Sequence, residues 1–399
     1  MPSRTLARRC LAVLLALAAA ASAGREAPPA EPAEPAAAVL RLEPLEFAAL
    51  DGWAADDHGA ALATFLVSCG ALENKDPGAA MGGDAAFGLV GDWLEPCAAA
   101  RRTPPGEARA FFEAWFRPWR ASDAGDPEGL FTGYYEPLLE AAWAPDGRYR
   151  FPLYRRPADM VAVDLGLFSE ELEGKAITGR MEGGTLVPYH DRAAIDRGAL
   201  AGQGLELAWV DDDVALFFLH IQGSGRLRFA DGSEVRVGYD GQNGQAYYAI
   251  GRELVARGEL TVEEVSLQSI RDWLKAHPDE AAALMHTNPS YVFFRELDGA
   301  GPLGAQGVPL TPGRSLAVDR HMIAYGTPVW LETTLPDGRP LVRLMVAQDT
   351  GGAIRGPVRG DVFFGTGEEA EWLAGHMKGR GGYAVLLPRR LSEALVAAM

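Results

Sequence analysis

Short apolar runs separated by glycine and aspartate fill the middle of this 399-residue chain and constrain its fold most strongly. Between Gly129 and about Gly251 they include FTGYYEP, ELAWVDDD and ALFFLHIQGSGRLRFADGSEVRVGYDGQNG. This spacing is typical of antiparallel strands and hairpins. Glycine is also frequent, with 47 residues, or about 12% of the chain against a usual ~7%. The excess has no fixed period, which excludes collagen and favours turn-rich β structure.

Three segments carry signals for the start of a helix. Thr103-Pro104 supplies N-cap and N1 residues ahead of an apolar helical face. Two capping boxes follow, Thr261-x-x-Glu264 and Thr366-x-x-Glu369. The expected helices end at Pro118, Pro278 and near Gly379. Strands are expected again in the last quarter of the chain, near Pro328–Glu332, Leu341–Ala347 and Tyr383–Leu387.

The composition is that of a globular protein, with 48% hydrophobic, 23% charged and 9% aromatic residues, and it rules out wholesale disorder. At roughly 100–200 residues per domain, two or three domains are expected. The formal net charge of −17 argues against nucleic acid or an anionic membrane as the main partner. A glycan, as a neutral or mixed polymer, is not excluded.

Residues 1–23 have the pattern of a secretory signal peptide. Its parts are a positive region with Arg4, Arg8 and Arg9, an apolar region from Leu11 to Ala20, and the cleavage site Ala21-Ser22-Ala23. An uncleaved anchor is the alternative, but the apolar run is shorter than the ~20 residues that span a bilayer. No later segment of the sequence is apolar enough to cross a membrane. Residues 24–38 form a Pro/Ala/Glu tether, and we expect export to the periplasm.

The three cysteines divide into one in the signal and two in the mature chain. Cys10 precedes the apolar stretch, whereas a lipidated cysteine follows it, so the sequence has no lipobox there. Association with the outer membrane is left open. Cys69 and Cys97 are an even pair in an exported chain, which predicts one disulfide, with two buried thiols as the alternative.

Motifs for metals, cofactors and serine nucleophiles are missing from the sequence. The seven His residues are scattered, without H-E-x-x-H or a Cys/His cluster. The glycine clusters lack G-x-x-x-x-G-K-[ST], and Gly223-Ser224-Gly225 is not G-x-S-x-G. The calcium-like start at Asp240 has Gly251 where a bidentate Glu would stand. We therefore expect neither a metal nor a cofactor.

Three aspartates in the last third of the chain are candidates for acid chemistry. Asp319 lies in SLAVDR, Asp349 ends the apolar run LVRLMVAQ, and Asp361 precedes Val-Phe-Phe-Gly. Apolar and aromatic surroundings favour the neutral form of a carboxyl group by desolvation, which suits a general acid. Each aspartate alone is more often a turn former or a cap, and spacing cannot show that the three converge.

Longer strings carry a resemblance to a known family. The N-terminal half contains FTGYYEP (Phe131–Pro137), ITGRMEGG (Ile177–Gly184), FFLHIQGSGRL (Phe217–Leu227) and VGYDGQNG (Val237–Gly244). The C-terminal half contains NPSYVFF, GAQGVPLTPGRSLAVDR, LMVAQDTGGAIRG and GDVFFGTGEEA. Through these strings, residues 47 to 388 resemble the membrane-bound lytic murein transglycosylase A family. The last group resembles its three-aspartate domain, named for residues such as Asp319, Asp349 and Asp361.

The resemblance implies a mainly β protein with peripheral helices. Residues 39–133 and 293–399 would form a discontinuous double-psi β-barrel, and residues 134–292 an inserted second β-rich domain. A glycan strand of peptidoglycan would lie in the groove between the two. The family name also implies a lipid anchor, from which this chain departs because it lacks the lipobox. The sequence does not identify protein partners.

The implied reaction cleaves the β-1,4 bond between N-acetylmuramic acid and N-acetylglucosamine without water. Asp361 matches the position that acts as general acid and then as base, so that the muramic C6 hydroxyl closes on C1 as a 1,6-anhydro ring. Asp349 would support it electrostatically. The residues that match the family's groove are Thr132, Gly133, Tyr134, Gln222, Gly223 and Ser224. Asp319 is placed with these binding residues, with a barrel-fixing hydrogen-bond acceptor as the alternative.

Two other functions stay open. Double-psi barrels in expansin-like proteins bind wall polysaccharide with little cleavage, so a non-catalytic binding protein is one. The second is a glycoside hydrolase that uses water with Asp349 as base, since ordinary glycosidases employ two carboxylates.

Overall fold

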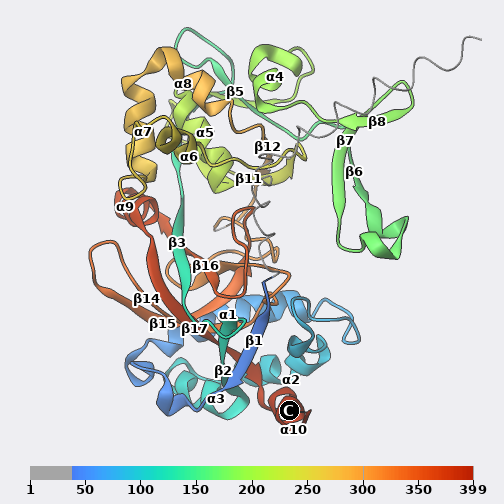
Figure 1. The fold of residues 1–399 in the computed structure, drawn as a ribbon, viewed down its shortest axis with the longest axis vertical. Helices are drawn as coiled ribbons and strands as arrows, with labels where there is room; N and C mark the ends of the chain where they lie inside the picture. Colours follow the sequence, from blue (N-terminus) through green and yellow to red (C-terminus); the bar gives the residue numbers. More distant parts are fainter. Residues whose placement is uncertain (1–37, 300, 399) are drawn as a thin grey trace, which may run out of the picture. The chain divides into compact units, whose positions relative to one another are not determined.

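Three β-sheets organise the part of the chain that the computed structural model describes, residues 38–299 and 301–398 (Figure 1). The predicted signal peptide, and the predicted tether up to residue 37, lie outside the described residues. The largest sheet has eight strands: β1 (Leu40–Pro44), β2 (Phe116–Asp123), β3 (Gly129–Glu136), β13 (Ser315–Val318), β14 (Pro328–Thr334), β15 (Pro340–Asp349), β16 (Arg359–Thr366) and β17 (Gly379–Pro388).

The second sheet takes its strands from the middle of the chain. It has six of them: β4 (Leu138–Ala142), β5 (Phe151–Tyr154), β9 (Glu206–Val210), β10 (Ser224–Arg228), β11 (Glu234–Gln242) and β12 (Val292–Leu297). The third sheet consists of β6 (Met160–Asp164), β7 (Ala176–Glu182) and β8 (Thr185–Pro188). Because β12 pairs with β11, the six-stranded sheet runs past the predicted domain boundary at residue 292. The domain boundaries themselves stay a prediction.

Helices cover both larger sheets. They are α1 (His58–Leu72), α2 (Gly91–Ala100), α3 (Ala108–Trp115), α4 (Arg192–Ala194), α5 (Asp213–Gln222), α6 (Ile250–Ala256), α7 (Leu267–Ala276), α8 (Pro278–Met285), α9 (Glu368–His376) and α10 (Arg389–Ala398). Figure 1 shows α1, α2 and α3 gathered near strands of the largest sheet, and α5 to α8 near the six-stranded sheet.

Six strands of the largest sheet close into a barrel in the order β17-β14-β15-β13-β16-β3. The ring is closed by antiparallel pairing of β17 with β3, where Gly381 lies opposite Gly129. Two of its contacts are parallel, β13 with β15 and β16 with β3. Strands β2 and β1 extend the sheet outside the ring. The predicted mainly β fold with a barrel is therefore confirmed, whereas the double-psi connectivity stays a prediction.

The barrel strands carry long apolar runs because both of their faces are covered. Residues 383–387 of β17 are all buried, as are residues 344–348 of β15. Buried side chains of α1, α2 and α3 join those of the barrel strands in one hydrophobic cluster. A strand covered on both faces loses the alternation of a half-exposed strand. Within this cluster a disulfide joins Cys69 of α1 to Cys97 of α2.

One predicted β segment is wrong: residues 213–222 form helix α5. The helix begins because the side chain of Asp212 accepts a hydrogen bond from the backbone N–H of Ala215, and it ends at Gly223, whose φ of 76° suits glycine. Its apolar residues pack into two different hydrophobic cores. Leu216 and Leu219 join the core of the six-stranded sheet, while residues 214, 217 and 218 join the core with α6, α7 and α8. Burial on both sides hides the helical periodicity.

The predicted helices exist, but their ends differ. Helix α3 ends at Trp115, before Pro118, because residues 116–123 pair as strand β2 with β1 and β17. Thr261 and Glu264 make the reciprocal hydrogen bonds of a capping box but close only a turn. Helix α7 starts six residues later, capped by Ser266. The pairing of β2 therefore set the end of α3, and the Ser266 cap set the start of α7. The three later strands lie within β14, β15 and β17, as predicted.

Replacing Gly129 by alanine is expected to destabilise the barrel by about 3 kcal/mol or more, because overpacking against immobile backbone is costly. A Cβ atom at Gly129 would lie 1.7 Å from the carbonyl oxygen of Val358. Gly147 is a matched control, since a Cβ there meets nothing within 4 Å. Thermal unfolding of G129A and G147A measures the difference. Equal unfolding temperatures would show that β3 and the segment before β16 are not this close.

Candidate active site

Strand β13 places Asp349 and Asp361 on one face of the barrel sheet. Its residue Ala317 is in register with Asp349 of β15 on one side and with Asp361 of β16 on the other. Residues directly opposite each other on neighbouring strands project from the same face. Since neighbouring strands lie about 4.8 Å apart, the two aspartate backbones are about 10 Å apart, with Ala317 on the strand between them. Two acids that are 12 positions apart in sequence therefore share one site.

Asp361 is held by a short chain of hydrogen bonds. Thr132, its register partner on β3, donates from Oγ1 to Asp361 Oδ1 at 2.6 Å. Arg359 donates from Nη2 to Thr132 Oγ1 at 2.8 Å. Burial raises the pKa of Asp361, and the opposing effects of the Arg359 charge and of the Thr132 hydrogen bond do not cancel it. Asp361 is therefore a carboxyl group whose protonated form is favoured.

Asp349 accepts three hydrogen bonds. Tyr134 Oη donates to Oδ2 at 2.8 Å, and the backbone N–H groups of Ala305 and Thr350 donate to Oδ1, each at 2.8 Å. Burial raises the pKa of Asp349 to about 6 although all three donors lower it, and the nearby charge of Asp361 adds to the rise. The two carboxyl groups therefore interact electrostatically.

Burial raises the pKa of both aspartates, to about 6 for Asp349, so both are suited to holding and releasing a proton. Neither residue is completely buried, so a ligand can approach them. Raised pKa values from burial, combined with a specific charge partner, are typical of acid–base catalysts. The chemistry that this arrangement supports best is proton donation by one carboxyl group beside a second carboxylate that is firmly held.

Asp319 has a different environment from the other two aspartates. It is 4% exposed, and its two carboxylate oxygens accept from the backbone N–H groups of His321 at 3.1 Å and Gly356 at 2.9 Å. These bonds join the turn after β13 to the loop before β16. The predicted contact of Asp319 with substrate is not favoured by this geometry. The side chain serves as a hydrogen-bond acceptor that fixes two loops of the barrel.

Gly133 faces away from the carboxyl groups. Because side chains alternate along a strand, it lies on the opposite face from Thr132 and Tyr134. A Cβ there would lie 2.4 Å from Cε2 of Phe364 and 3.0 Å from the Cα of Ala374 in α9. The absence of a side chain thus allows α9 to pack on β3, while the place of Gly133 in the glycan groove stays a prediction.

Gln222 connects the six-stranded sheet region to strand β3. It is the last residue of α5, and its Oε1 accepts from the backbone N–H of Tyr135 at 3.1 Å. Gly223 then ends the helix and Ser224 opens β10, where it is buried. The structure therefore brings Gln222 next to the strand that carries Thr132 and Tyr134. No hydrogen bond links Gln222 directly to Asp349 or Asp361 among the described residues.

Sequence reasoning missed three contributors to the site. Arg359 stands two positions before Asp361 on one strand, and period-two alternation could have placed both on the same face. No comparable sequence pattern indicates that Ala317 or the backbone N–H of Ala305 belongs to the site. The first depends on strand register, and the second belongs to a loop that reaches Asp349 only in the folded protein.

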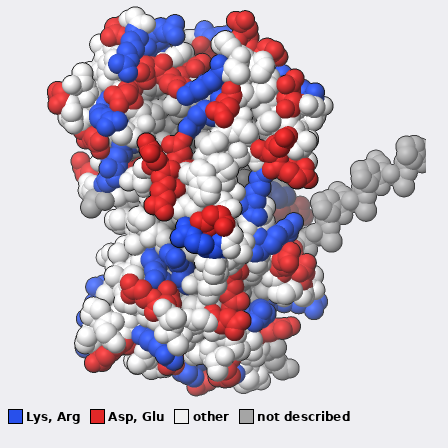
Figure 2. All heavy atoms as spheres, turned by 90° about the vertical axis from the view of Figure 1, so that its left-hand side faces the viewer, with Lys and Arg blue, Asp and Glu red and all other residues white. Residues whose placement is uncertain are grey.

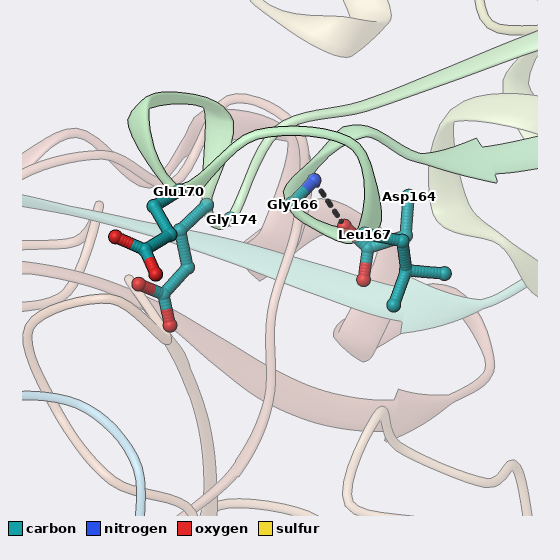
Figure 3. A pocket seen from close by; sticks show the side chains of 6 residues that line it. Asp164, Gly166, Leu167, Glu170 and Gly174 are labelled. Atoms are coloured by element: carbon teal, nitrogen blue, oxygen red, sulfur yellow. Dashed lines mark hydrogen bonds between the residues drawn. The ribbon is translucent and has the colours of Figure 1, made fainter.

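Other features of the described residues do not point to a second reaction centre. A cavity of about 500 Å³ is lined by the segment that connects β6 to β7, and Figure 3 shows Asp164, Gly166, Leu167 and Glu170 around it. None of its lining residues belongs to the barrel strands. Residues 38–299 and 301–398 contain no cluster of His, Cys, Asp or Glu positioned to hold a metal ion. No helix in the same ranges has the length and apolar character for crossing a membrane.

The charges on the face drawn in Figure 2 are mixed. Lys and Arg side chains lie between Asp and Glu side chains, and on the described part of this face they form no continuous basic surface. A nucleic-acid partner would require such a surface. This view is in keeping with the acidic composition of the chain.

Two family models match the chain. One is described as the MltA specific insert domain and matches residues 130–295, and the other is described as the 3D domain and matches residues 314–387. The first covers most of β3 and the six-stranded sheet up to Arg295 within β12. The second contains Asp319, Asp349 and Asp361.

Relatives from three bacteria are similar over most of the chain. The membrane-bound lytic murein transglycosylase A of Vibrio cholerae is 35% identical over 265 residues, 64% of each chain, so the match spans just under two thirds of that protein. The Escherichia coli K12 protein of the same name is 34% identical over 298 residues, 72% of each. A crystal structure of a membrane-bound lytic murein transglycosylase from Agrobacterium tumefaciens has a TM-score of 0.80 at 39% identity, covering 88% of this chain and 99% of that one. E. coli MltA, solved with bound chitohexaose, has a TM-score of 0.62 at 28% identity, covering 88% and 94%.

Proposed function

This chain belongs to the membrane-bound lytic murein transglycosylase A family, and on that premise we propose that it is a peptidoglycan lyase. Its substrate is the glycan strand of peptidoglycan, which it cleaves between N-acetylmuramic acid and N-acetylglucosamine, leaving 1,6-anhydromuramic ends. The observation that carries this proposal is the placement of Asp361 and Asp349 on either side of Ala317, both with raised pKa values.

The first step transfers one proton. Protonated Asp361 gives its proton to the glycosidic oxygen, the bond from C1 of muramic acid to that oxygen breaks, and N-acetylglucosamine leaves with a free 4-hydroxyl group. Positive charge develops at C1 and the ring oxygen. The carboxylate of Asp349, held by three hydrogen-bond donors, stabilises that charge without reorganising.

The second step returns the proton. The Asp361 carboxylate takes the proton of the muramic C6 hydroxyl as O6 forms a bond to C1, which closes the anhydro ring. The enzyme ends in its starting protonation state, and no water is consumed. One carboxyl group suffices as acid and then base because the nucleophile already belongs to the substrate. The hydrogen bond from Thr132 keeps Asp361 in one orientation for both steps.

Binding of the glycan is proposed to involve the barrel and the six-stranded sheet together. Strand β3 of the barrel is followed after one residue by β4 of the other sheet, and Gln222 bonds to the backbone of β3 beside Tyr134. A strand of sugars that crosses this junction would pass Thr132 and Tyr134. The bound chitohexaose of the E. coli relative supports a glycan of this chemical type.

We also propose export to the periplasm through the signal peptide at residues 1–23.

Mass spectrometry of the sugars released from purified sacculi tests the function. The mature protein is expected to release muropeptides with 1,6-anhydromuramic ends. Products heavier by one water molecule would contradict the proposal and favour a hydrolase in which Asp349 activates water. Binding to sacculi without any released product would instead favour a non-catalytic wall-binding protein.

Thr132→Val is expected to shift the alkaline limb of the pH profile of kcat to higher pH by about one unit. The Thr132 hydroxyl stabilises the ionised form of Asp361 and so lowers its pKa, and a hydrogen bond to a charged group is worth roughly 1.5–3 kcal/mol. Without it, the pKa of Asp361 rises and the acid stays protonated to higher pH. Thr185→Val, on the exposed first residue of β8, is the control. A limb that stays in place or moves to lower pH would exclude Asp361 as the titrating acid.

A further inference from the structure

Trp143 presents an unusual aromatic surface at one end of the six-stranded sheet. Its side chain is 60% exposed, and its ring stacks flat on the buried ring of Phe229, with centroids 4.0 Å apart and planes inclined by 9°. One face of the indole is therefore backed by Phe229. The opposite face is left to solvent.

The strands hold this pair in place. Strands β4 and β10 run parallel, with Glu140 opposite Arg228, and Trp143 and Phe229 follow just beyond the ends of these strands. Phe229 also opens a tight turn, in which it exchanges backbone hydrogen bonds with Gly232 and Ser233. The Trp143 ring is thus oriented before any ligand arrives, which reduces the entropy cost of binding.

The surroundings favour a sugar over a protein as the ligand. Residues 144–148 and 230–234 on the two adjoining loops are exposed and are polar or small. Glu140 and Arg228 form an exposed ion pair at 2.9 Å on the same two strands. A protein interface would need a contiguous apolar patch of several hundred Å². A single flat ring bordered by polar groups fits a pyranose ring, which offers one apolar C–H face and hydroxyl groups at its edge.

The position of Trp143 separates it from the carboxyl groups. Strand β3 leads from the barrel towards helices α5 and α6 (Figure 1), and β4 continues the chain after Pro137. Trp143 follows the end of β4 that is away from β3, five residues or about 17 Å of strand beyond Leu138. A long glycan strand that passes the carboxyl groups can also reach this end of the six-stranded sheet.

We propose that Trp143 is the platform of a second carbohydrate-binding site, which stacks on an N-acetylhexosamine residue of a glycan strand outside the catalytic groove. The inference rests on the proposed function, because that function supplies a polymer with many equivalent sugar rings. A second contact on one polymer raises the overall affinity through effective concentration, without changing the chemistry at Asp361.

Equilibrium binding to insoluble sacculi, measured in the Asp361→Asn background so that nothing is cleaved, tests the proposal. Trp143→Ala is expected to raise the apparent Kd by about five- to tenfold, the loss typical of one aromatic stacking contact. Trp143→Phe should lose less. Trp372→Ala is the matched control. Trp372 of α9 is also exposed, at 43%, but its ring is tilted by 32° against His376 and is not stacked flat on a second ring. Its Kd should equal that of the parent.

A chitotetraose probe separates the possible outcomes. We expect the effect of Trp143→Ala to be much smaller for this tetramer than for sacculi. An equal loss with both probes would place Trp143 in the catalytic groove and overturn the second site. Unchanged binding of sacculi by Trp143→Ala would show that Trp143 only covers Phe229. If the parent itself bound no sacculi, the proposed function would fail first and this inference with it.

Discussion

Asp361→Asn is expected to lower kcat on peptidoglycan by about 10³-fold, because the asparagine can neither give nor take the proton that both steps require. The substitution keeps the shape of the side chain. Its amide oxygen can still accept the hydrogen bond that Thr132 donates, so the geometry around β16 should persist. Release of anhydromuropeptides from sacculi, quantified by mass spectrometry, measures the effect.

The stability of this variant provides an independent readout. Burial raises the pKa of Asp361, so the folded state binds a proton more tightly than the unfolded state, and the native protein loses stability as pH rises towards the folded pKa. Because an asparagine does not titrate, D361N lacks this loss of stability at higher pH. D361N should therefore unfold at an equal or higher temperature than the parent at pH 7, and the difference should vanish in acid.

Asp337→Asn is the control for D361N. Asp337 lies in the turn between β14 and β15, at the end of β15 away from Asp349, and it binds Arg339 at the surface. Its removal should leave turnover unchanged. If D361N kept more than a tenth of the parent's turnover while folding normally, Asp361 would not be the general acid.

Asp349→Asn is expected to lower kcat by about 10²-fold, the cost of losing one preorganised electrostatic contact in the transition state. The amide can still accept the N–H groups of Ala305 and Thr350, and the Tyr134 hydroxyl can rotate to accept from the new amide. The variant therefore removes the negative charge with little change in shape. The same assay of released anhydromuropeptides measures the fall in kcat.

The pH profile distinguishes the role of Asp349 from a merely structural one. Since the carboxylate must be ionised to stabilise positive charge, the parent's activity should rise with pH through the pKa of Asp349, about 6. Asp349→Asn should abolish this acid limb. Tyr134→Phe removes one donor that lowers the pKa of Asp349, so it should move the limb to higher pH instead of removing it. An acid limb that persists in Asp349→Asn would assign it to another group.

The sequence alone determined the mainly β character of the chain and the acids worth considering. Both conclusions rest on local information. Short apolar runs between turn residues predict strands, as in β14, β15 and β17. The strings around Asp349 and Asp361 are long enough to resemble one family, and that family is the one to which the chain belongs.

Sequence reasoning failed where burial or pairing outweighed the local pattern. Residues 213–222 have few polar positions, because α5 is buried against two cores, so a helix resembles a strand in sequence. Helix α3 stops early because its next residues complete a sheet with β1 and β17. For Asp319 the sequence left two roles open, and the hydrogen bonds that its carboxylate accepts from two backbone N–H groups favour the barrel-fixing one.

Only the tertiary structure decided which groups share the candidate site. Ala317 aligns Asp349 with Asp361 through the register of three strands, and register depends on pairing partners that the chain meets only on folding. The same pairing brings Thr132 from 229 positions away to Asp361, and a loop brings the N–H of Ala305 to Asp349. The raised pKa values follow from this burial. The sequence identifies each carboxyl group, but the residues that surround it in the folded protein set its pKa.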